Sequence, residues 1–177
     1  EVLGAINQFT TSASALDLRS NLLSSTEYLN QPYFNVTDFG AKPDDAVADS
    51  AALQSVLDIA GLVGSSVVYV GPGTFIAENL RIFGSNLKLI GPGTLKLTDR
   101  SAAVGVLTVA GNQNVIADLT IDGNAAGRPT GRAEGLRVFG TGNWVRDVVA
   151  VDAVYNDATS ATGINFFVGG VQNTLER

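Results

Sequence analysis

Two stretches of this chain gather side chains that can bind and cleave a polar ligand. They run from 122 to 135 and from 152 to 163. The candidate catalytic carboxylates are Asp122, Glu134, Asp152 and Asp157, and the candidate substrate-binding residues are Arg128, Arg132 and Tyr155. Carboxylates supply acids, bases and nucleophiles, arginines bind anionic groups, and a tyrosine ring stacks on a sugar. The chemistry of such a set would be glycosidic-bond cleavage.

Asp122 and Asp152 form the most specific candidate pair. They are 30 positions apart, so in a chain that coils with that period they would lie one coil apart, near the ~4.8 Å strand spacing. Carboxyl groups about 5 Å apart suit a retaining glycosidase, and their repulsion raises one pKa. A lyase would instead use an arginine or lysine base, with a cation beside the substrate's carboxylate. For each residue alone, a solvated loop side chain or an ordinary turn is the commoner explanation.

The composition excludes several classes of site. The 177 residues contain no Cys and no His, which rules out disulfides, cysteine nucleophiles, histidine metal ligands and catalytic histidines. The formal net charge is −6, from 11 basic and 17 acidic residues, which argues against nucleic acid or an anionic membrane as the partner. No stretch reaches the roughly 20 apolar residues that cross a bilayer. We expect neither a cofactor nor a metal ion.

An asparagine recurs at nearly constant spacing in the chain. It stands at 86, 114, 143 and 173, two or three residues after a glycine and just before a strand-like run. A period of 28 to 30 residues built from short strands and glycine turns is typical of a solenoid. In a parallel β-helix the amide of one asparagine donates to a carbonyl of the neighbouring coil. We therefore predict that these four residues form an internal ladder and do not bind a ligand.

Short strands and two helical segments account for the rest of the pattern. Strand-like runs separated by tight corners stand at 67–70, 74–77, 80–83, 87–90 and 94–97. Such corners, without intervening ten-residue helices, favour a parallel β-helix over a βαβ sheet. A capping helix is predicted after Asp49, with Leu53, Val56, Leu57 and Ala60 on one face and Gly61 at its end. The segment 12–30 predicts a short amphipathic helix or stalk.

One motif resembles a known family. Residues 34–42 read Phe-Asn-Val-Thr-Asp-Phe-Gly-Ala-Lys, and Asp45, Asp49, Val-Val-Tyr-Val at 67–70 and Pro-Gly-Thr-Phe at 72–75 follow. This arrangement resembles the opening of the pectate-lyase-like superfamily, which includes glycosidases, lyases, epimerases and phage tailspikes. Pro43-Asp44-Asp45 replaces the usual Gly-Asp-Gly, and Gly71 replaces a proline, both at turn positions. The chain lacks polygalacturonase motifs, and without His it lacks the Asp-Pro-His signature of mannuronan epimerases.

The resemblance implies an all-β fold, a single-stranded right-handed parallel β-helix of the pectin-lyase type with an N-terminal helical stalk and a capping helix. We expect a stalk or connector at 1–33, a cap segment with its helix at 34–65, and the first coils at 66–177, truncated at the C-terminus. The run 164–168 is apolar and would leave an open edge. We therefore expect further sequence, a cap or a partner subunit to cover that end.

The residues before the cap favour one branch of the superfamily. Leu-Arg-Ser-Asn-Leu at 18–22 and the polar residues that follow look like the connector of phage and prophage tailspikes. We predict an extracellular segment of a virion tail that binds, and if catalytic cleaves, a surface polysaccharide. It would act as a homotrimer beside other virion tail proteins. The alternatives are a secreted polysaccharide lyase or glycoside hydrolase and a non-catalytic adhesive or structural solenoid, with catalytic residues beyond Arg177 left open.

Overall fold

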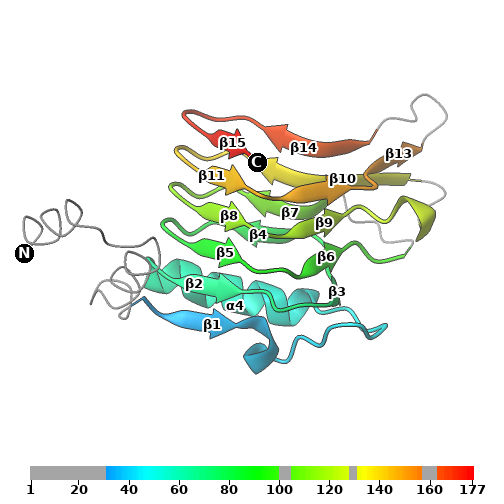
Figure 1. Cartoon of the computed structure of the whole chain (residues 1–177), viewed down its shortest axis with the longest axis horizontal. Helices are drawn as coiled ribbons and strands as arrows, with labels where there is room; N and C mark the ends of the chain where they lie inside the picture. Colours follow the sequence, from blue (N-terminus) through cyan, green and yellow to red (C-terminus); the bar gives the residue numbers. More distant parts are fainter. Residues whose placement is uncertain (1–30, 100–104, 128–130, 157–162) are drawn as a thin grey trace, which may run out of the picture. The chain divides into compact units, whose positions relative to one another are not determined.

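The computed structural model describes residues 31–99, 105–127, 131–156 and 163–177 (Figure 1). The chain divides into two compact units, 1–31 and 32–177. The predicted stalk lies almost wholly outside the described residues and stays a prediction. Within the described residues, the one α-helix is α4 (Ser50–Val63), and 3-10 turns occur at η1 (Val36–Phe39) and η2 (Ala125–Gly127). The second unit is therefore mainly β.

Three sheets wrap around one interior. Sheet A contains β1 (Tyr33–Asn35), β2 (Val67–Tyr69), β5 (Lys88–Ile90), β8 (Val115–Ala117), β11 (Trp144–Arg146) and β15 (Thr174–Glu176). Sheet B contains β3 (Thr74–Ile76), β6 (Thr94–Lys96), β9 (Thr120–Asp122) and β12 (Val149–Val151). Sheet C contains β4 (Leu80–Ile82), β7 (Gly105–Val109), β10 (Gly131–Val138) and β14 (Ile164–Val168), with β13 (Val154–Asn156) on β10.

The connections define a parallel β-helix. Each coil visits sheets A, B and C in turn, and strands of successive coils pair in parallel, for example β5 with β8 and β8 with β11. The coils follow one another from the blue strand β1 to the red strand β15 in Figure 1. The pairing of β10 with β13 is antiparallel. The fold class expected from the sequence is thus confirmed as a mainly β structure of three parallel sheets, consistent with a right-handed β-helix.

In the central strands of sheets A and B, the middle residue of each three-residue strand fills the interior. Phe75, Leu95 and Ile121 stack in sheet B, and Leu89 and Ile116 stack in sheet A, all at 2% exposure or less. Side chains alternate across a strand, so the residues before and after each middle position point away from the interior. The sequence pattern of polar, apolar, polar triplets therefore decides which residues are presented to ligands.

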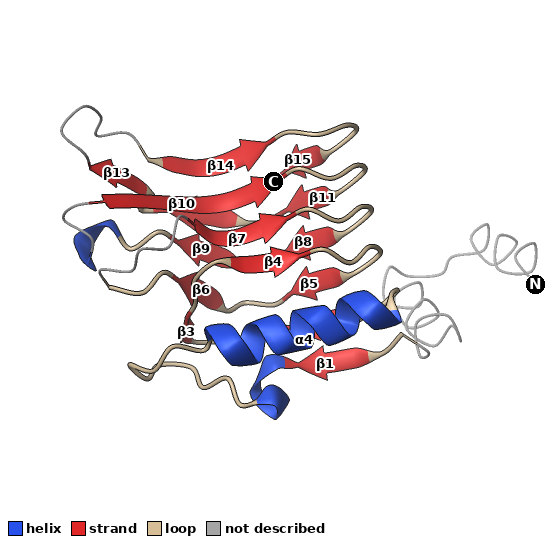
Figure 2. Ribbon diagram, turned by 180° about the vertical axis from the view of Figure 1, so that it is seen from behind, coloured by secondary structure: helices blue, strands red, loops and turns tan. Residues whose placement is uncertain are grey.

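Helix α4 covers the first coil, as expected for a cap. Its buried residues are Leu53, Val56, Leu57 and Ala60, the predicted face. The predicted end at Gly61 is wrong, because the helix continues to Val63 and Gly64 caps it. Gly61 instead lies against Gly84, where a side chain at either position would collide with the other backbone. Figure 2 shows α4 beside β1 and β4 at this end of the coil stack.

Polar side chains of the cap form hydrogen bonds with backbone groups at the edge of the first coil. Gln54 accepts a hydrogen bond from the Arg81 backbone N–H at 2.9 Å and donates to the Arg81 carbonyl at 2.9 Å. The Ser50 hydroxyl accepts from the Glu78 N–H. Asp49 is 5% exposed and accepts from the N–H groups of Lys42 and Ile76. Burial raises the pKa of the Asp49 carboxyl, although these two hydrogen bonds act in the opposite direction.

The asparagine ladder forms, but with three members. The side-chain oxygens of Asn114, Asn143 and Asn173 accept from the N–H groups of Leu87, Asn114 and Asn143, at 2.8 to 2.9 Å. Their amides donate to the carbonyls of Gly84, Gly111 and Gly140. The inclusion of Asn86 is wrong, because Leu87 occupies the ladder position in that coil. Asn86 stands one residue earlier with φ 60°, a turn position that it shares with Gln113 and Gly142.

The last coil is more exposed than the first. In β14, Ile164 and Phe167 are 39% and 42% exposed, and in β15 the middle residue Leu175 is 49% exposed. The expectation that something covers this end stays a prediction. Among the described residues, no helix is long and apolar enough to cross a membrane.

Candidate functional site

The corner where sheet B passes into sheet C contains the backbone of five of the seven residues predicted from the sequence, namely Asp122, Arg132, Glu134, Asp152 and Tyr155. The first half of β10 extends past the coil and pairs with β13, so Arg132 lies opposite Tyr155 in the antiparallel register. The second half returns to the coil, where Glu134 and Leu136 pair with β7 and β14. The predicted loops 122–135 and 152–163 therefore contain strands. This hairpin-like extension brings the backbones of Arg132 and Tyr155 side by side.

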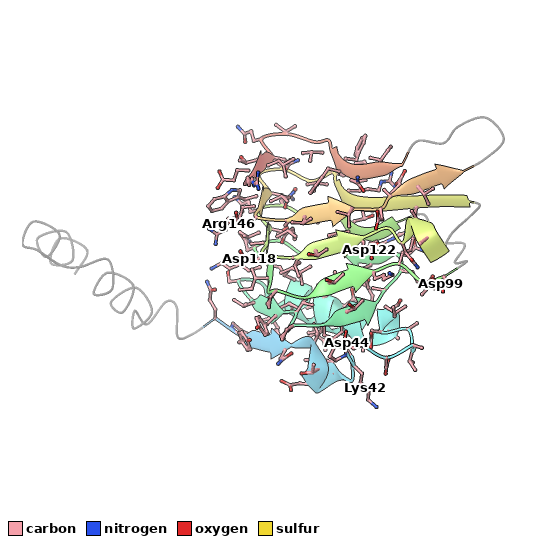
Figure 3. The ribbon with its side chains drawn as sticks, turned by 45° about the vertical axis from the view of Figure 1, so that its right-hand side comes forward. Lys42, Asp44, Asp99, Asp118, Asp122 and Arg146 are labelled. Carbon is pink, nitrogen blue, oxygen red and sulfur yellow. The ribbon has the colours of Figure 1, made fainter. Side chains whose placement is uncertain are left out.

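Asp122 is held in place by two groups. Its side chain forms an ion pair with Lys96 at 3.3 Å and accepts from the Asn124 N–H at 2.7 Å, and it is 16% exposed. The Asn124 amide donates to the Leu97 carbonyl and to Asp99 at 2.7 Å. Figure 3 shows Asp122 and Asp99 near each other on this side of the molecule. Every one of these contacts is internal, so they orient Asp122 as part of the corner.

The register of Asp122 and Asp152 differs from the expected one. Asp122 lies opposite Val151 in the pairing of β9 with β12, so Asp152 stands one position beyond the equivalent residue. Asp152 adopts φ 53° at the turn and is exposed. The coil at this point is one residue shorter than the spacing assumed, and a one-residue slip moves a side chain to the other face of a strand. The two aspartates are therefore not stacked equivalents, and their joint catalytic role stays a prediction.

Glu134 is the buried carboxylate of the site. It is 3% exposed, and its Oε2 lies 3.1 Å from the Nε of Arg137 on the same strand. The Arg137 guanidinium is partly exposed and lies 4.9 Å from the ring centre of Phe139. That ring lies 5.3 Å from Phe167 of the next coil. A buried anion thus lies beside a cation that packs on an exposed pair of aromatic rings.

A row of outward-facing residues crosses sheet C at Arg137. The strand registers place Arg81 opposite Thr108, Thr108 opposite Arg137, and Arg137 opposite Phe167. Arg81 is exposed on β4 between the buried residues Leu80 and Ile82. The row carries two arginines two coils apart, roughly 10 Å at the usual strand spacing. It is an elongated surface for an anionic polymer.

Some predicted residues cannot be placed. Arg128 and Asp157 lie outside the described residues, and for Arg132 and Tyr155 only the backbone is described. Sequence reasoning missed Lys96, Arg81 and Arg137, although a signal existed. Each occupies an outward position of a strand, beside buried apolar residues, which is where a charged residue meets solvent. Among the described residues no three acidic side chains gather as they would around a metal ion.

Comparison with known proteins finds a family match for the cap and the first coils. Residues 33–115 match the family model described as rhamnogalacturonase A/epimerase, pectate lyase-like. Alginate lyase 7 of Azotobacter vinelandii is 32% identical over 108 residues, which cover 51% of this chain and 13% of that protein. The mannuronan C5-epimerase AlgE6 of the same organism is 29% identical over 113 residues, covering 52% and 13%. The match thus spans a small part of each curated relative.

Solved structures agree on the fold. The A-module of mannuronan C-5 epimerase AlgE6 of Azotobacter vinelandii superposes with a TM-score of 0.63 at 22% identity, covering 80% of this chain and 41% of that one. ORF18 of Geobacillus virus E2 superposes with a TM-score of 0.59 at 19% identity, covering 81% and 30%. At these identities the likeness establishes the fold alone.

Proposed function

We propose that this chain, which carries a pectate lyase-like β-helix domain, binds an acidic polysaccharide across the outer face of sheet C. The observation that carries the proposal is the row formed by Arg81, Thr108 and Arg137 and continued by Phe167. Arginine binds carboxylates through paired N–H donors. The curated relatives are named for alginate and mannuronan, so we propose a uronic acid polymer as the ligand.

The row matches the shape of such a polymer. It runs across the strands, along the axis on which the coils stack, so a linear glycan lying on it meets both arginines. Phe139 and Phe167 are 41% and 42% exposed and offer apolar ring faces for sugar stacking. The chain as a whole carries a charge of −6, so this local pair of cations supplies the attraction that the net charge opposes.

Glu134 acts in this proposal as the positioning residue for Arg137. The carboxylate faces the Nε, and the guanidinium has four further N–H donors for a ligand. Because Glu134 is nearly fully buried, the ion pair fixes the arginine in one orientation. Cleavage of the bound glycan by Asp122, Glu134, Asp152 and Asp157 remains the catalytic hypothesis.

The finer biological setting that we propose is a tailspike-type virion protein. Support comes from the connector-like segment before the cap, and the homotrimer and the contacts with other virion tail proteins belong to the same proposal. A secreted lyase or hydrolase is the second candidate, favoured by the names of the curated relatives. Light scattering on the natural full-length protein separates the two, because a stable monomer contradicts the tailspike setting.

Affinity electrophoresis in gels that contain mannuronan tests the binding site. Arg81→Gln and Arg137→Gln each remove one cation from the row and should weaken retention about tenfold, since a hydrogen bond to a charged group contributes roughly 1.5–3 kcal/mol. Lys42→Gln is the charge-matched control, because Lys42 is exposed on the cap, away from sheet C (Figure 3). Gels that contain neutral β-1,4-mannan should retain none of these proteins.

The same proteins test the catalytic hypothesis. Release of unsaturated or reducing ends from mannuronan by the wild type, and its loss in Asp122→Asn and Asp152→Asn, would support cleavage. Asp118→Asn is the control, since Asp118 is exposed at a different corner. In the gel experiment, equal retention of Arg81→Gln, Arg137→Gln and the Lys42→Gln control would refute the proposed binding site.

A further inference from the structure

Sheet A presents a second set of aromatic and cationic side chains, on a face that does not contribute to the proposed site. Its middle residues Val68, Leu89, Ile116 and Val145 are buried, so the residues on either side of them face outward. One flanking row contains Tyr33, Val67, Lys88, Val115, Trp144 and Thr174. The other contains Asn35, Tyr69, Ile90, Ala117, Arg146 and Glu176, of which Ala117 is itself buried.

Trp144 is the centre of this face. It is the single tryptophan of the chain and is 39% exposed. Its register neighbours are the smaller residues Val115 and Thr174. The Arg146 guanidinium lies 5.1 Å from the Trp144 ring centre, within cation–π distance. An exposed ring and a cation therefore stand side by side on a flat surface.

An aromatic pair lies at the other end of the same face. Tyr33 stacks on Tyr69 with their ring centres 6.0 Å apart, and Tyr33 is 58% exposed. From Tyr33 on β1 to Trp144 on β11 there are four strand steps, roughly 19 Å. Lys88 stands between them in the same row as Trp144. Along the coil axis the face thus presents the ring of Tyr33, then the cation of Lys88, and then the ring of Trp144 beside Arg146.

Within the described residues 31–99, 105–127, 131–156 and 163–177, the corners beside sheet A are short. The corners that lead from sheet A to sheet B are short, at 91–93, 118–119 and 147–148. In contrast, the corners that lead into sheet C carry the long β10–β13 extension. Figure 3 places Arg146 on the other side of the coil stack from Asp99. A long polymer can therefore lie across several coils of sheet A at a place separate from the proposed site.

We propose that sheet A is a second, non-catalytic binding platform for an acidic polysaccharide that lies along the coil axis. The apolar C–H face of a pyranose ring stacks on Trp144, and uronate carboxylates lie beside Arg146 and Lys88. A pyranose ring suits an exposed indole because one of its faces is apolar while its edges are polar. The choice of a uronan rests on the proposed function, whereas the platform rests on its own residues.

Tryptophan fluorescence tests the platform directly, because Trp144 is the chain's single fluorophore of this kind. Titration with mannuronan oligosaccharides should give a saturable change in emission and should protect Trp144 from acrylamide quenching. Arg146→Gln keeps the fluorophore and should weaken the apparent Kd about tenfold. Arg137→Gln should leave the fluorescence titration unchanged. Neutral β-1,4-mannan oligosaccharides of equal length should give no saturable change.

Three outcomes would overturn the platform. The first is constant emission and constant quenching with mannuronan, while gel retention still depends on Arg137; this keeps the proposed site and removes the platform. The second is an identical titration in Arg146→Gln and the wild type. The third is an emission change that follows protein concentration without glycan, because the face is then an interface between copies. A saturable, Arg146-dependent signal without any Arg137-dependent retention supports the platform and refutes the site on sheet C.

Discussion

The two ends of the coil stack differ in how well their terminal coil is covered. At the N-terminal end, α4 buries Leu53, Val56 and Leu57 to 3% exposure or less, and Gln54 bonds to the backbone of the edge strand β4. At the other end, Leu175, a middle residue of its strand, is 49% exposed. The first end of the described stack is thus closed by its own helix, and the last is not.

The difference indicates that the capping helix and the stacking of coils stabilise this fold independently. A solenoid is stabilised by the contact of each coil with its neighbours, so a terminal coil lacks one of its two interfaces. Helix α4 replaces that interface in two ways. It supplies apolar surface for the interior. In addition, Gln54 and Ser50 form hydrogen bonds with backbone N–H groups at the edge, which a preceding coil would otherwise pair.

Leucine truncation at the two ends gives the largest expected contrast. Leu53→Ala removes a side chain that is 2% exposed and should lower the free energy of unfolding by about 3 kcal/mol, as for other buried leucines. Leu175→Ala makes the same chemical change at the half-exposed end and should cost under about 1 kcal/mol. Urea denaturation followed by circular dichroism measures both. Equal losses would mean that the last coil is as well packed as the first.

The asparagine ladder gives the next contrast. Asn143 is 1% exposed, and its removal in Asn143→Ala leaves the Asn114 N–H and the Gly111 carbonyl without their partners. We expect a loss of about 2 kcal/mol, the usual cost of buried unsatisfied groups. Asn173→Ala, in the more exposed last coil, should cost less because water reaches the groups that it bonds. A larger loss for Asn173→Ala would contradict this order in the same urea experiment.

The sequence predicts the coils well, because strand triplets and turns are local. It predicts register less well. Asn86 follows a glycine like the ladder asparagines, but the turn before β5 places Leu87 at the ladder position. Glycine is typical of helix ends, yet Gly61 lies inside the helix, where its lack of a side chain allows the close approach of the Gly84 backbone. Both errors arise from contacts between segments far apart in sequence, which local patterns do not contain.

The prediction of the candidate site depended on strand register even more than the prediction of the fold did. Asp122 and Asp152 were matched by their spacing, and a coil shorter by one residue sets Asp122 opposite Val151. The partners that hold Asp122, Lys96 and Asn124, become visible only when β6 and β9 are paired. The strand pattern contained the positions of Arg81 and Arg137. Their alignment in one row follows from the lengths of the corners between them.

The smallest expected effect concerns the pH dependence of the closed end. Burial raises the pKa of Asp49 above its usual value of 3.8, so the folded state holds a proton that the unfolded state has already released. The stability from this group is fully present below pH 3.8 and is lost as the pH rises through the folded pKa. Asp49→Asn removes the titration and should also lower stability by a constant amount, since its amide replaces one acceptor oxygen.

The free energy of unfolding of the wild type minus that of Asp49→Asn should therefore decrease as the pH rises from below 3.8, and then level off. Ser50→Ala is the control, because it removes the neighbouring bond to the Glu78 N–H without removing a titrating group. Its difference from the wild type should stay constant over the same range. A difference for Asp49→Asn that grows with pH would mean that the hydrogen bonds from Lys42 and Ile76 outweigh burial, and that the cap holds Asp49 as a stabilised carboxylate.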